Sequence, residues 1–431
     1  MCVNGTEERR AGEPSASGVR ADKVVREAAE LAAEALGSVI AAPPAALDEA
    51  LRAMAGLLRA DLAPVRAANE ADISAASAAG MSAALLDRLR LTPERLLGMS
   101  EQLLSLAAVP AEPGRTKIRD LPDGLVVEER RRPVGVIGAN FEARPNVVVD
   151  IASQFIKSRN AGVLRTGSAA LSSAASLADH VIEPALAQAG LDPRLIQVIR
   201  EPGHELASAL VRQATFLPLV IVRGSGASTR ALAAEGAAHG VRVLAHADGG
   251  AVVYVDDSAS PQLVNAIIEA SLDRLGVCNR LNLLLIKGSA WQRTLSALQP
   301  LLERLGVRAS LPPHAHELGR EWALEPGREA TITVSQVTGP AHAALVANEA
   351  TSQLAACVIA ADEAAAAEFV GGYAGTGAFH NAPPRLLDGF KLFGIPETGI
   401  NIDRVPGPRG PVTFRDLYLR QLVVKPKHSA A

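Results

Sequence analysis

The sequence is poor in aromatic residues, and it lacks a strong net charge of either sign. Aromatic side chains make up 3% of the 431 residues, and the formal net charge is −3. Nucleic-acid-binding proteins need basic patches, and single-strand binders add aromatic stacking surfaces, so we expect no nucleic-acid partner. No stretch of the chain reaches 18 uninterrupted apolar residues, so the sequence predicts no membrane span.

Cysteine is also scarce. Cys2, Cys278 and Cys357 are an odd and sparse set, which excludes a disulfide framework and is typical of a reducing compartment. Residues 1–21 carry charge, glycine and serine but no apolar segment, so they predict a disordered tail and not a signal peptide. No cysteine or histidine spacing indicates a metal site. We therefore expect a cytoplasmic protein that binds no metal.

The chain does contain helical patterns followed by a regular alternation of strands and helices. Apolar residues at helical spacing between about residues 22 and 106 predict several helices. From Val134 onward short apolar runs alternate with helical segments up to about His380, which predicts an α/β fold with an open parallel sheet. Two strand-like segments, about 125–131 and 417–424, stand apart from this alternation. A chain of this length predicts two or three domains.

Cys278 lies in the turn LGVCNR, between a predicted helix and an apolar strand where ligands could gather. A nucleophilic cysteine needs a lowered pKa, which a helix terminus or nearby cations can supply. The alternative is a small buried cysteine that only fills space, and the residue taken alone favours that alternative. Cys357 lies in the apolar segment ACVIA, and we expect it in the core.

Two turns that follow predicted strands combine glycine with serine. One is the segment RGSG at Arg223, and the other is the segment RTGS at Arg165. Glycine lets the backbone approach a phosphate closely and serine can donate a hydrogen bond, so together the turns favour a nucleotide. Neither has the glycine spacing of a dinucleotide fingerprint, and a plain strand-to-helix turn is the alternative.

A third turn, FEARPN, brings a carboxylate, a guanidinium and an amide together before a predicted helix. Arg144 could bind a carboxylate or phosphate through two parallel hydrogen bonds. The alternative is an internal pair between Glu142 and Arg144, with Asn146 capping the helix.

In this order, the segments LLDRLRLTPERL, RRPVGVIGANFEARPNVVVDIAS, KSRNAGVLR, RGSG, GVCN and NAPPRLLDG, with a later RGP, resemble the gamma-glutamyl phosphate reductase family. This family is a branch of the aldehyde dehydrogenase superfamily. The resemblance implies a Rossmann-like cofactor-binding domain (22–118 and 134–250), an α/β catalytic domain (251–390) and a small oligomerisation arm (119–133 and 412–431). It also implies a homodimer or homotetramer, with a glutamate 5-kinase as a candidate partner.

The resemblance implies NADPH-dependent reduction of L-glutamyl 5-phosphate to L-glutamate 5-semialdehyde, a step of proline biosynthesis, through a thioester on Cys278. Asn146 matches the position that holds the developing oxyanion. The other matching positions are Arg144, Asn279, Arg385 and Arg409 for the substrate, and Arg165, Thr166, Gly167, Ser168, Arg223, Gly224 and Ser225 for the cofactor. Ala247 stands where hydrolytic aldehyde dehydrogenases have a water-activating glutamate, which favours acyl transfer over hydrolysis.

Several positions depart from the family pattern. The segment after Arg165 lacks the usual glycine pair, residues 271–275 lack the usual Lys, Gln, Arg and Pro, Asn282 replaces an acid, and 354–356 replace a His-Ser-acid group. Lost polar contacts weaken specificity for a charged substrate. The alternative function is therefore an NAD(P)-dependent acyl-phosphate reductase or aldehyde dehydrogenase with a different small substrate. A third hypothesis, a non-enzymatic scaffold, is disfavoured by the retained cysteine and asparagines.

Overall fold

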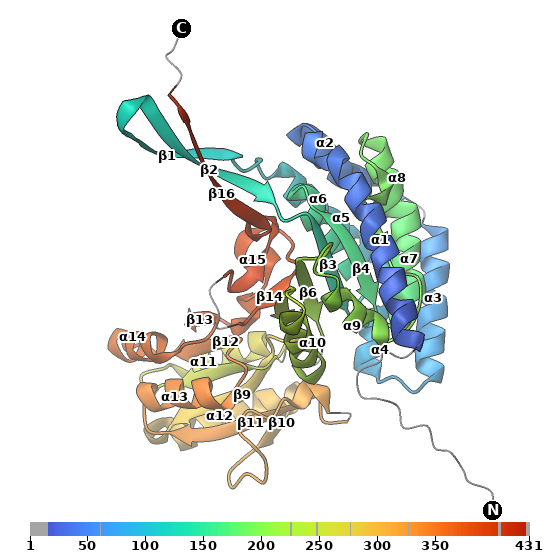
Figure 1. The fold of residues 1–431 in the computed structure, drawn as a ribbon. Coiled ribbons are helices and arrows are strands. Elements are labelled where there is room, and N and C mark those ends of the chain that lie inside the picture. Colours follow the sequence, from blue (N-terminus) through green and yellow to red (C-terminus); the bar gives the residue numbers. More distant parts are fainter. Residues whose placement is uncertain are drawn as a thin grey trace, which may run out of the picture.

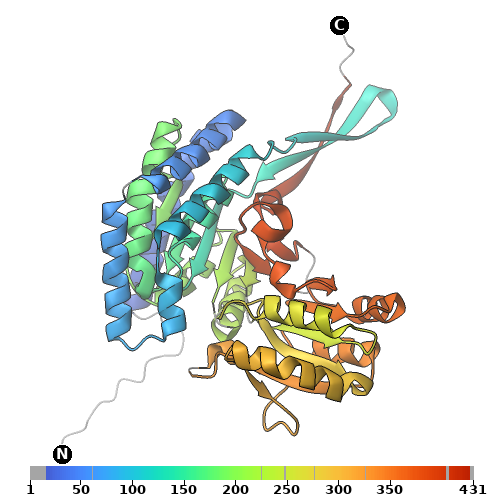
Figure 2. The same cartoon turned by 180° about the vertical axis from the view of Figure 1, so that it is seen from behind.

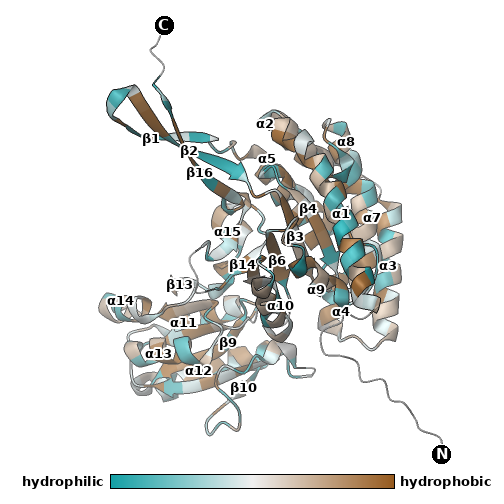
Figure 3. Ribbon diagram, viewed as in Figure 1, coloured by the Kyte–Doolittle hydropathy of each residue, from teal (hydrophilic) through white to brown (hydrophobic). Residues whose placement is uncertain are grey.

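The computed structural model describes residues 16–427 except 61, 225, 247–248, 276, 326 and 404–406. Two parallel sheets, each with helices packed against it, form the body of the molecule, and an antiparallel sheet projects away from them (Figure 1). The predicted α/β fold is confirmed. Figure 3 shows hydrophobic residues concentrated in the strands of the parallel sheets, which are the centres of the cores. Among the described residues, no helix is long and apolar enough to cross a membrane.

The N-terminal part is helical, as predicted. Its helices are α1 (Ala16–Ala41), α2 (Pro44–Arg59), α3 (Ala63–Ala78), α4 (Ala83–Leu89) and α5 (Pro93–Ala108). Thr92 caps α5, because its side chain accepts a hydrogen bond from the backbone N–H of Arg95. The predicted tail of residues 1–21 is too long, since α1 begins at Ala16 and Ala21 is already buried. The small apolar residues of that turn pack in the core, while residues 1–15, with Cys2, lie outside the described residues.

The first parallel sheet has the strand order β5-β4-β3-β6-β7. Its strands are β3 (Val136–Phe141), β4 (Ala161–Thr166), β5 (Ile196–Val198), β6 (Leu219–Arg223) and β7 (Arg242–His246). The helices between them are α6 (Val147–Lys157), α7 (Leu171–Leu177), α8 (Glu183–Gln188), α9 (Glu205–Arg212) and α10 (Gly226–Ala238). The chain adds strands on one side of β3 and then on the other, so the crevice beyond the carboxyl ends of β3 and β6 is a topological switch point, where ligands bind.

The second parallel sheet has the order β10-β11-β9-β8-β12-β13. Its strands are β8 (Ala251–Val255), β9 (Leu281–Lys287), β10 (Arg308–Ser310), β11 (Thr331–Val337), β12 (Ala355–Ile359) and β13 (Gly377–His380). Its helices are α11 (Pro261–Ser271), α12 (Trp291–Arg304), α13 (Pro340–Ala350) and α14 (Glu363–Gly372). Helix α15 (Gly389–Phe393) and the hairpin of β14 (Gly399–Asn401) and β15 (Gly410–Val412) follow. We call the part built around the first parallel sheet the first body and the part built around the second parallel sheet the second body. Seen from behind, this red segment lies between the two bodies and leads into the projecting sheet (Figure 2).

The projecting sheet contains β1 (Arg115–Asp120), β2 (Leu125–Pro133) and β16 (Tyr418–Pro426) in the order β1-β2-β16. The two strand-like segments that the resemblance assigns to one arm pair with each other, with Tyr418 opposite Pro133 and Pro426 opposite Leu125. The predicted arm boundaries 119–133 and 412–431 need correction. Strand β1 begins at Arg115, and its fully exposed sequence RTKIRD has no apolar pattern that could predict it.

The C-terminal boundary is wrong for a different reason. Val412 belongs to β15, and Phe414 and Leu417 are buried in the core of the first body. The backbone N–H of Phe414 donates to Gln154 Oε1 at 2.6 Å, and Asn160 Nδ2 donates to the Leu417 carbonyl at 3.0 Å. The chain therefore crosses the first core before it leaves as β16.

Candidate active site

A cavity of about 350 Å³ lies where the helical layer, the first sheet and the start of the second body meet. Its lining contains many charged side chains: the arginines Arg88, Arg90, Arg95, Arg144, Arg223 and Arg274, and the acids Asp150, Asp388 and Glu397. Such a concentration of guanidinium groups suits an anionic ligand with more than one charged group.

Cys278 follows Val277, which lines the cavity, and its side chain is partly exposed. Burial raises the pKa of the thiol above its ordinary value, and the charges of Glu397 and Glu321 add to this shift. The charges of Arg144 and Arg223 oppose it. The cations expected beside the cysteine are therefore present, but burial outweighs them, so the expectation of a lowered pKa is wrong for this arrangement.

The backbone of Cys278 packs directly against a pair of glycines. The N–H of Gly250 donates to the Cys278 carbonyl at 2.6 Å. A Cβ atom on Gly249 would lie 2.6 Å from both the Cα and the carbonyl oxygen of Cys278, so only glycine fits there. The N–H of Gly249 donates to Glu321 Oε2 at 3.1 Å, which fixes the glycine pair from the other side. Ala247 lies outside the described residues.

Two different sheet edges meet at this site. Arg144 and Asn146 follow β3 and Arg223 ends β6, so they lie at the carboxyl edge of the first sheet. Cys278 precedes β9 and lies at the amino edge of the second sheet. The hypothesis that Cys278 stands at the ligand-binding edge of its own sheet therefore needs correction, because the ligand-binding edge belongs to the first sheet.

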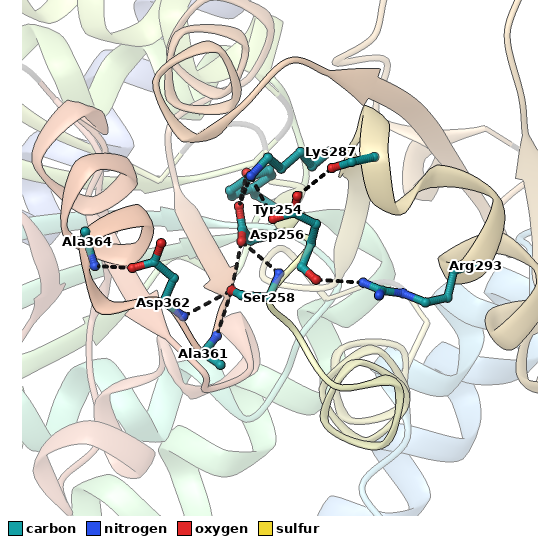
Figure 4. A network of polar contacts seen from close by, with 10 residues as sticks. Tyr254, Asp256, Ser258, Lys287, Arg293, Ala361, Asp362 and Ala364 are labelled. Atoms are coloured by element: carbon teal, nitrogen blue, oxygen red, sulfur yellow. Dashed lines mark hydrogen bonds and ion pairs between the residues drawn. The ribbon is translucent and has the colours of Figure 1, made fainter.

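The carboxyl edge of the second sheet is closed by polar contacts of its own (Figure 4). Asp256 accepts hydrogen bonds from the Tyr254 hydroxyl at 2.8 Å, Ser258 Oγ at 2.8 Å and Lys287 Nζ at 3.3 Å. Burial would raise the pKa of Asp256, but the hydrogen bonds from Ser258 and Tyr254 hold it well below its usual range. Because its acceptors are filled by neighbouring protein groups, we interpret this network as structural.

Asn146 stands at the first turn of α6, and the alternative that it caps this helix is wrong because its side chain makes no capping bond. Instead its Nδ2 donates to Asp150 Oδ2 at 3.0 Å. Ala143 adopts a φ of 44°, in the left-handed region, which turns the chain sharply between β3 and the helix. The turn thereby places both Arg144 and Asn146 on the cavity wall.

Asn279 and Arg385, both predicted to bind substrate, contact each other. Asn279 Nδ2 donates to the Leu387 carbonyl at 2.9 Å, while Arg385 donates to Asn279 Oδ1 and, through Nε, to Asp273 Oδ1 at 2.6 Å. These bonds fasten the turn after Cys278 to the segment before α15. Neither residue lines the cavity, so the geometry favours a role in holding the cysteine turn.

Arg409 lies apart from the other predicted substrate residues. Its guanidinium donates to the backbone carbonyls of Ala374 at 2.8 Å and Ile402 at 3.4 Å. It does not line the cavity.

The predicted cofactor residues gather at the carboxyl edge of the first sheet. Added Cβ atoms would lie 3.9 Å from Glu142 Cα at Gly167 and 3.3 Å from Glu142 Oε1 at Gly224, so both glycine turns flank Glu142. Ser168 is exposed beside Gly167, while Ser225 lies outside the described residues. The hydroxyl of Thr166 is buried and has no hydrogen-bond partner within the described part of the chain.

The two arginines predicted to bind the cofactor, Arg165 and Arg223, have different surroundings. Arg165 is buried, and its guanidinium donates to Asn140 Oδ1 and the Gly203 carbonyl, both at 2.9 Å, which ties β4 to its neighbours. Arg223 lines the cavity and donates to the Thr398 carbonyl at 3.2 Å. The structure thus brings Arg223 together with Arg144, near Cys278.

Sequence reasoning missed several cavity residues. Arg88 belongs to the segment LLDRLRLTPERL, whose closely spaced arginines were the available signal. Asp150 follows Asn146 by one helical turn, so its place on the same helix face could have been predicted. Glu397 lies in a glycine- and proline-rich segment without periodicity, so only the three-dimensional structure reveals it.

The profile of the aldehyde dehydrogenase family matches residues 9–319 of this chain. The chain belongs to the aldehyde dehydrogenase family. A gamma-glutamyl phosphate reductase from Roseiflexus castenholzii is 34% identical over 393 residues, which cover 87% of this chain and 92% of that protein. Another, from Chloroflexus aggregans, is 35% identical over 390 residues, covering 85% and 90%.

The crystal structure of gamma-glutamyl phosphate reductase from Thermotoga maritima has a TM-score of 0.83 to this chain at 25% identity, covering 94% of this chain and 99% of that one. The predicted resemblance to gamma-glutamyl phosphate reductases is confirmed. The chain is therefore an oxidoreductase of a family that uses NAD(P), so the scaffold hypothesis is not needed.

The structure shows what the residues at the departures from the family pattern contact. Asn282 Nδ2 donates to the Arg320 carbonyl at 2.9 Å and its Oδ1 accepts from the Trp322 N–H at 3.2 Å, so the amide holds the loop that carries Glu321. Leu354 and Ala355 are buried in an apolar cluster against which Cys278 packs. These replacements therefore serve packing beneath the cysteine.

The two described cysteines, Cys278 and Cys357, should differ in reactivity. Cys357 is fully buried in β12, and burial raises the pKa of its thiol to about 12. We expect a thiol reagent to modify Cys278 in the native protein and to modify Cys357 only after unfolding. Peptide mapping by mass spectrometry after timed labelling measures both sites, and rapid modification of Cys357 in the folded protein would contradict this prediction.

Proposed function

We propose that this chain reduces L-glutamyl 5-phosphate to L-glutamate 5-semialdehyde and phosphate in proline biosynthesis, with NADPH as reductant and Cys278 as nucleophile. The observation that carries the proposal is the group of arginines lining the cavity beside Cys278. The substrate carries a carboxylate and a phosphate, and planar guanidinium groups bind both kinds of anion through paired hydrogen bonds. An uncharged aldehyde has no anionic group for these arginines to bind, so the charged lining favours the acyl phosphate.

In the first chemical step the sulfur of Cys278 attacks the acyl carbon. The new S–C bond forms as the C–O bond to phosphate breaks; the phosphate leaves with the electron pair of that bond and takes up the proton that the Cys278 thiol gives up. The positive charges of Arg144 and Arg223 favour the thiolate over the thiol. They also attract the phosphate, so the same two side chains assist the nucleophile and the leaving group.

Negative charge develops on the acyl oxygen during attack and again when the aldehyde forms. Asn146 can donate its Nδ2–H to this oxygen, since its amide lies on the cavity wall and is oriented by the bond to Asp150. An oriented amide needs no rearrangement when the charge appears, which is how an oxyanion hole lowers a barrier. The packing of Cys278 on Gly249 and Gly250 holds the sulfur in a fixed place relative to this amide.

The carboxyl edge of the first sheet fits a dinucleotide. Gly167 and Gly224 keep the backbone open to a close approach, and helix α10 begins two residues after Gly224 with its N-terminus at the same edge. The buried hydroxyls of Thr166 and Thr229 have no hydrogen-bond partners within the described residues and could be satisfied there. NADPH, when bound, supplies the hydride that reduces the acyl group; the preference for NADPH over NADH follows the family resemblance.

The reverse reaction tests this function. We expect phosphate-dependent reduction of NADP with glutamate 5-semialdehyde to exceed that with other small aldehydes under identical conditions. The reaction should stop when phosphate is omitted, because the thioester then has no acceptor. A higher turnover with an uncharged aldehyde, or turnover without phosphate, would favour the second function instead.

The second function, an acyl-phosphate reductase or aldehyde dehydrogenase with a different small substrate, is favoured by one observation. Polar positions of the family pattern are occupied here by Asn282, which is committed to a loop, and by the buried Leu354 and Ala355. Fewer polar groups are thus left for the substrate. We therefore expect a higher KM for glutamate 5-semialdehyde than that of the Roseiflexus castenholzii relative, measured side by side.

We also propose that the chain forms a homo-oligomer through the sheet of β1, β2 and β16. Strand β16 is at one edge of this sheet, and the exposed fractions of Leu419, Leu422 and Val424 are 54%, 56% and 56%. Exposed edge strands with apolar side chains invite pairing with a second chain.

Changing Leu422 and Val424 together to Glu should therefore convert the oligomer to a monomer, because buried carboxylates would oppose the interface. Sedimentation velocity measures the change. The matched control is Leu345→Glu on α13, where the leucine is 52% exposed but lies outside the arm. The proposal fails if the double variant sediments like the unchanged protein.

A further inference from the structure

Two carboxylates of the cavity are not explained by the binding of an anionic substrate. Asp150 projects from α6, and Glu397 comes from the segment after α15. Both line the cavity, and the charge of Asp150 raises the pKa of Glu397. In a site built to bind anions, two neighbouring acids must serve a different group of the ligand.

We propose that Asp150 and Glu397 bind the α-ammonium group of the substrate and so select an amino acid over analogues that lack a free amine. This inference rests on the proposed function, since it assigns a further part of the same substrate to the same cavity. The arginines would then bind the phosphate and the α-carboxylate, and the two acids would bind the remaining charge.

The hydrogen bonds of the two acids leave room for such a ligand. Asp150 Oδ2 accepts from Asn146 Nδ2 at 3.0 Å, and Glu397 Oε2 accepts from the Gly389 N–H at 2.6 Å. Within the described residues, neither carboxylate has another hydrogen bond, and neither forms an ion pair within 4.0 Å. Each therefore keeps one oxygen for a donor, and an ammonium group has three.

Asp388, the third acid of the cavity, differs from Asp150 and Glu397 because its hydrogen bonds cap a helix. Its Oδ1 accepts from the backbone N–H groups of Phe390 and Lys391, both at 3.1 Å, and thereby caps α15. Its charge raises the pKa of both Asp150 and Glu397. Asp388 thus adds negative charge beside the pair while its own hydrogen bonds are used in the fold.

The charges around Asp150 and Glu397 also favour a bound ammonium group. Burial raises the pKa of Asp150 to about 6 and that of Glu397 to about 7, although the charge of Arg223 lowers both. Arg144 also lowers that of Asp150. Burial therefore outweighs the nearby arginine charges at both carboxylates, and a bound ammonium group would favour their ionised forms.

The positions of Asn146 and Asp150 allow one short substrate to reach both. The two residues are four apart on one face of α6, and Asn146 Nδ2 lies 3.0 Å from Asp150 Oδ2. In a glutamyl group the α-carbon lies three C–C bonds from the reacting carbonyl carbon. With its carbonyl oxygen at Asn146, a substrate bent about these bonds can place its amine at the other oxygen of Asp150.

The test compares two aldehydes that differ only in the amino group, glutamate 5-semialdehyde and 5-oxopentanoate, in the phosphate-dependent reverse reaction. Glu397→Gln keeps the shape of the side chain and an acceptor for the Gly389 N–H. We expect it to lower kcat/KM for glutamate 5-semialdehyde roughly 10- to 100-fold, mainly through KM, because a charge-assisted hydrogen bond is lost. Glu397 also raises the pKa of Cys278, which affects both aldehydes alike, so the decisive quantity is the ratio of kcat/KM for glutamate 5-semialdehyde to that for 5-oxopentanoate, which should fall roughly 10- to 100-fold.

Each variant is compared with the wild type on the same substrate preparation, so cyclisation of the amino aldehyde cancels. Glu269→Gln is the matched control: this acid lies on α11, forms an exposed ion pair with Arg304 at 3.0 Å, and should affect neither substrate. Asp150→Asn is the second variant. It should reduce both activities by disturbing Asn146, but should reduce the activity on the amino substrate further.

Two failures can be told apart. If the wild type prefers glutamate 5-semialdehyde but both variants lose equal activity on the two aldehydes, the ammonium subsite is wrong and the proposed function stands. If the wild type turns over 5-oxopentanoate as well as glutamate 5-semialdehyde, or turns over neither, the proposed function and the subsite fall together.

Discussion

Cys278→Ala should lower turnover by at least about three orders of magnitude while leaving NADPH binding close to that of the wild type. The cysteine is expected to act in the chemical step, and removing a nucleophile takes away a covalent pathway that no neighbouring group replaces. The glycine turns at the carboxyl edge of the first sheet do not depend on its side chain. Steady-state kinetics in the reverse reaction and fluorescence titration with NADPH measure the two quantities.

Cys357→Ala is the control for this variant, because Cys357 is buried in β12 and is not part of the cavity lining. It should lose some stability through a small cavity but keep its turnover. The nucleophile assignment is refuted if Cys278→Ala retains more than about 5% of the wild-type activity.

Gly249→Ala should lower kcat by on the order of 100-fold or more. A Cβ atom at this position would lie 2.6 Å from the Cα and the carbonyl oxygen of Cys278, and both are backbone atoms that cannot rotate away. The cysteine turn must shift, and a displacement of about 1 Å in a catalytic group can cost 100-fold in rate. Activity and the melting temperature should be measured together.

Gly56→Ala is the matched control for the glycine variant. Gly56 lies inside α2, and a Cβ atom there would meet nothing within 4 Å. Alanine should raise the free energy of unfolding by roughly 0.5–1 kcal/mol and leave kcat unchanged. Wild-type activity in Gly249→Ala would show that the cysteine turn tolerates displacement. The close approach of Gly249 to Cys278 would then not be required for catalysis.

Local patterns predicted the elements of the fold well. The helix expected after the turn FEARPN is present as α6, which begins at Val147 directly after that turn. Strand β12 is also placed as expected, since a fully buried parallel strand is a short apolar run. Strand β1 was missed because all six of its residues are exposed and no alternation marks it.

The site was harder to predict, because its parts come from opposite edges of two sheets. The motif around Cys278 identified the cysteine, and the turn after β3 identified Arg144 and Asn146. That Glu397 lies near them follows from the packing of segments more than 100 residues apart, which no local spacing encodes. Asn279 and Arg385 were expected to bind substrate, yet they bind each other, because the sequence cannot show whether a polar side chain is already used within the fold.

The burial of Phe414 and Leu417 in the first core determines when that core can be completed during synthesis. Phe414 and Leu417 complete a core whose other members occur mostly before residue 245, and Asn160 bonds to Leu417 across 257 residues of sequence. During synthesis the first body emerges early but lacks these two side chains until translation is nearly finished. It must therefore wait in an incomplete state while the second body folds. The first core is therefore completed, and strand β16 is positioned, only late in synthesis and folding.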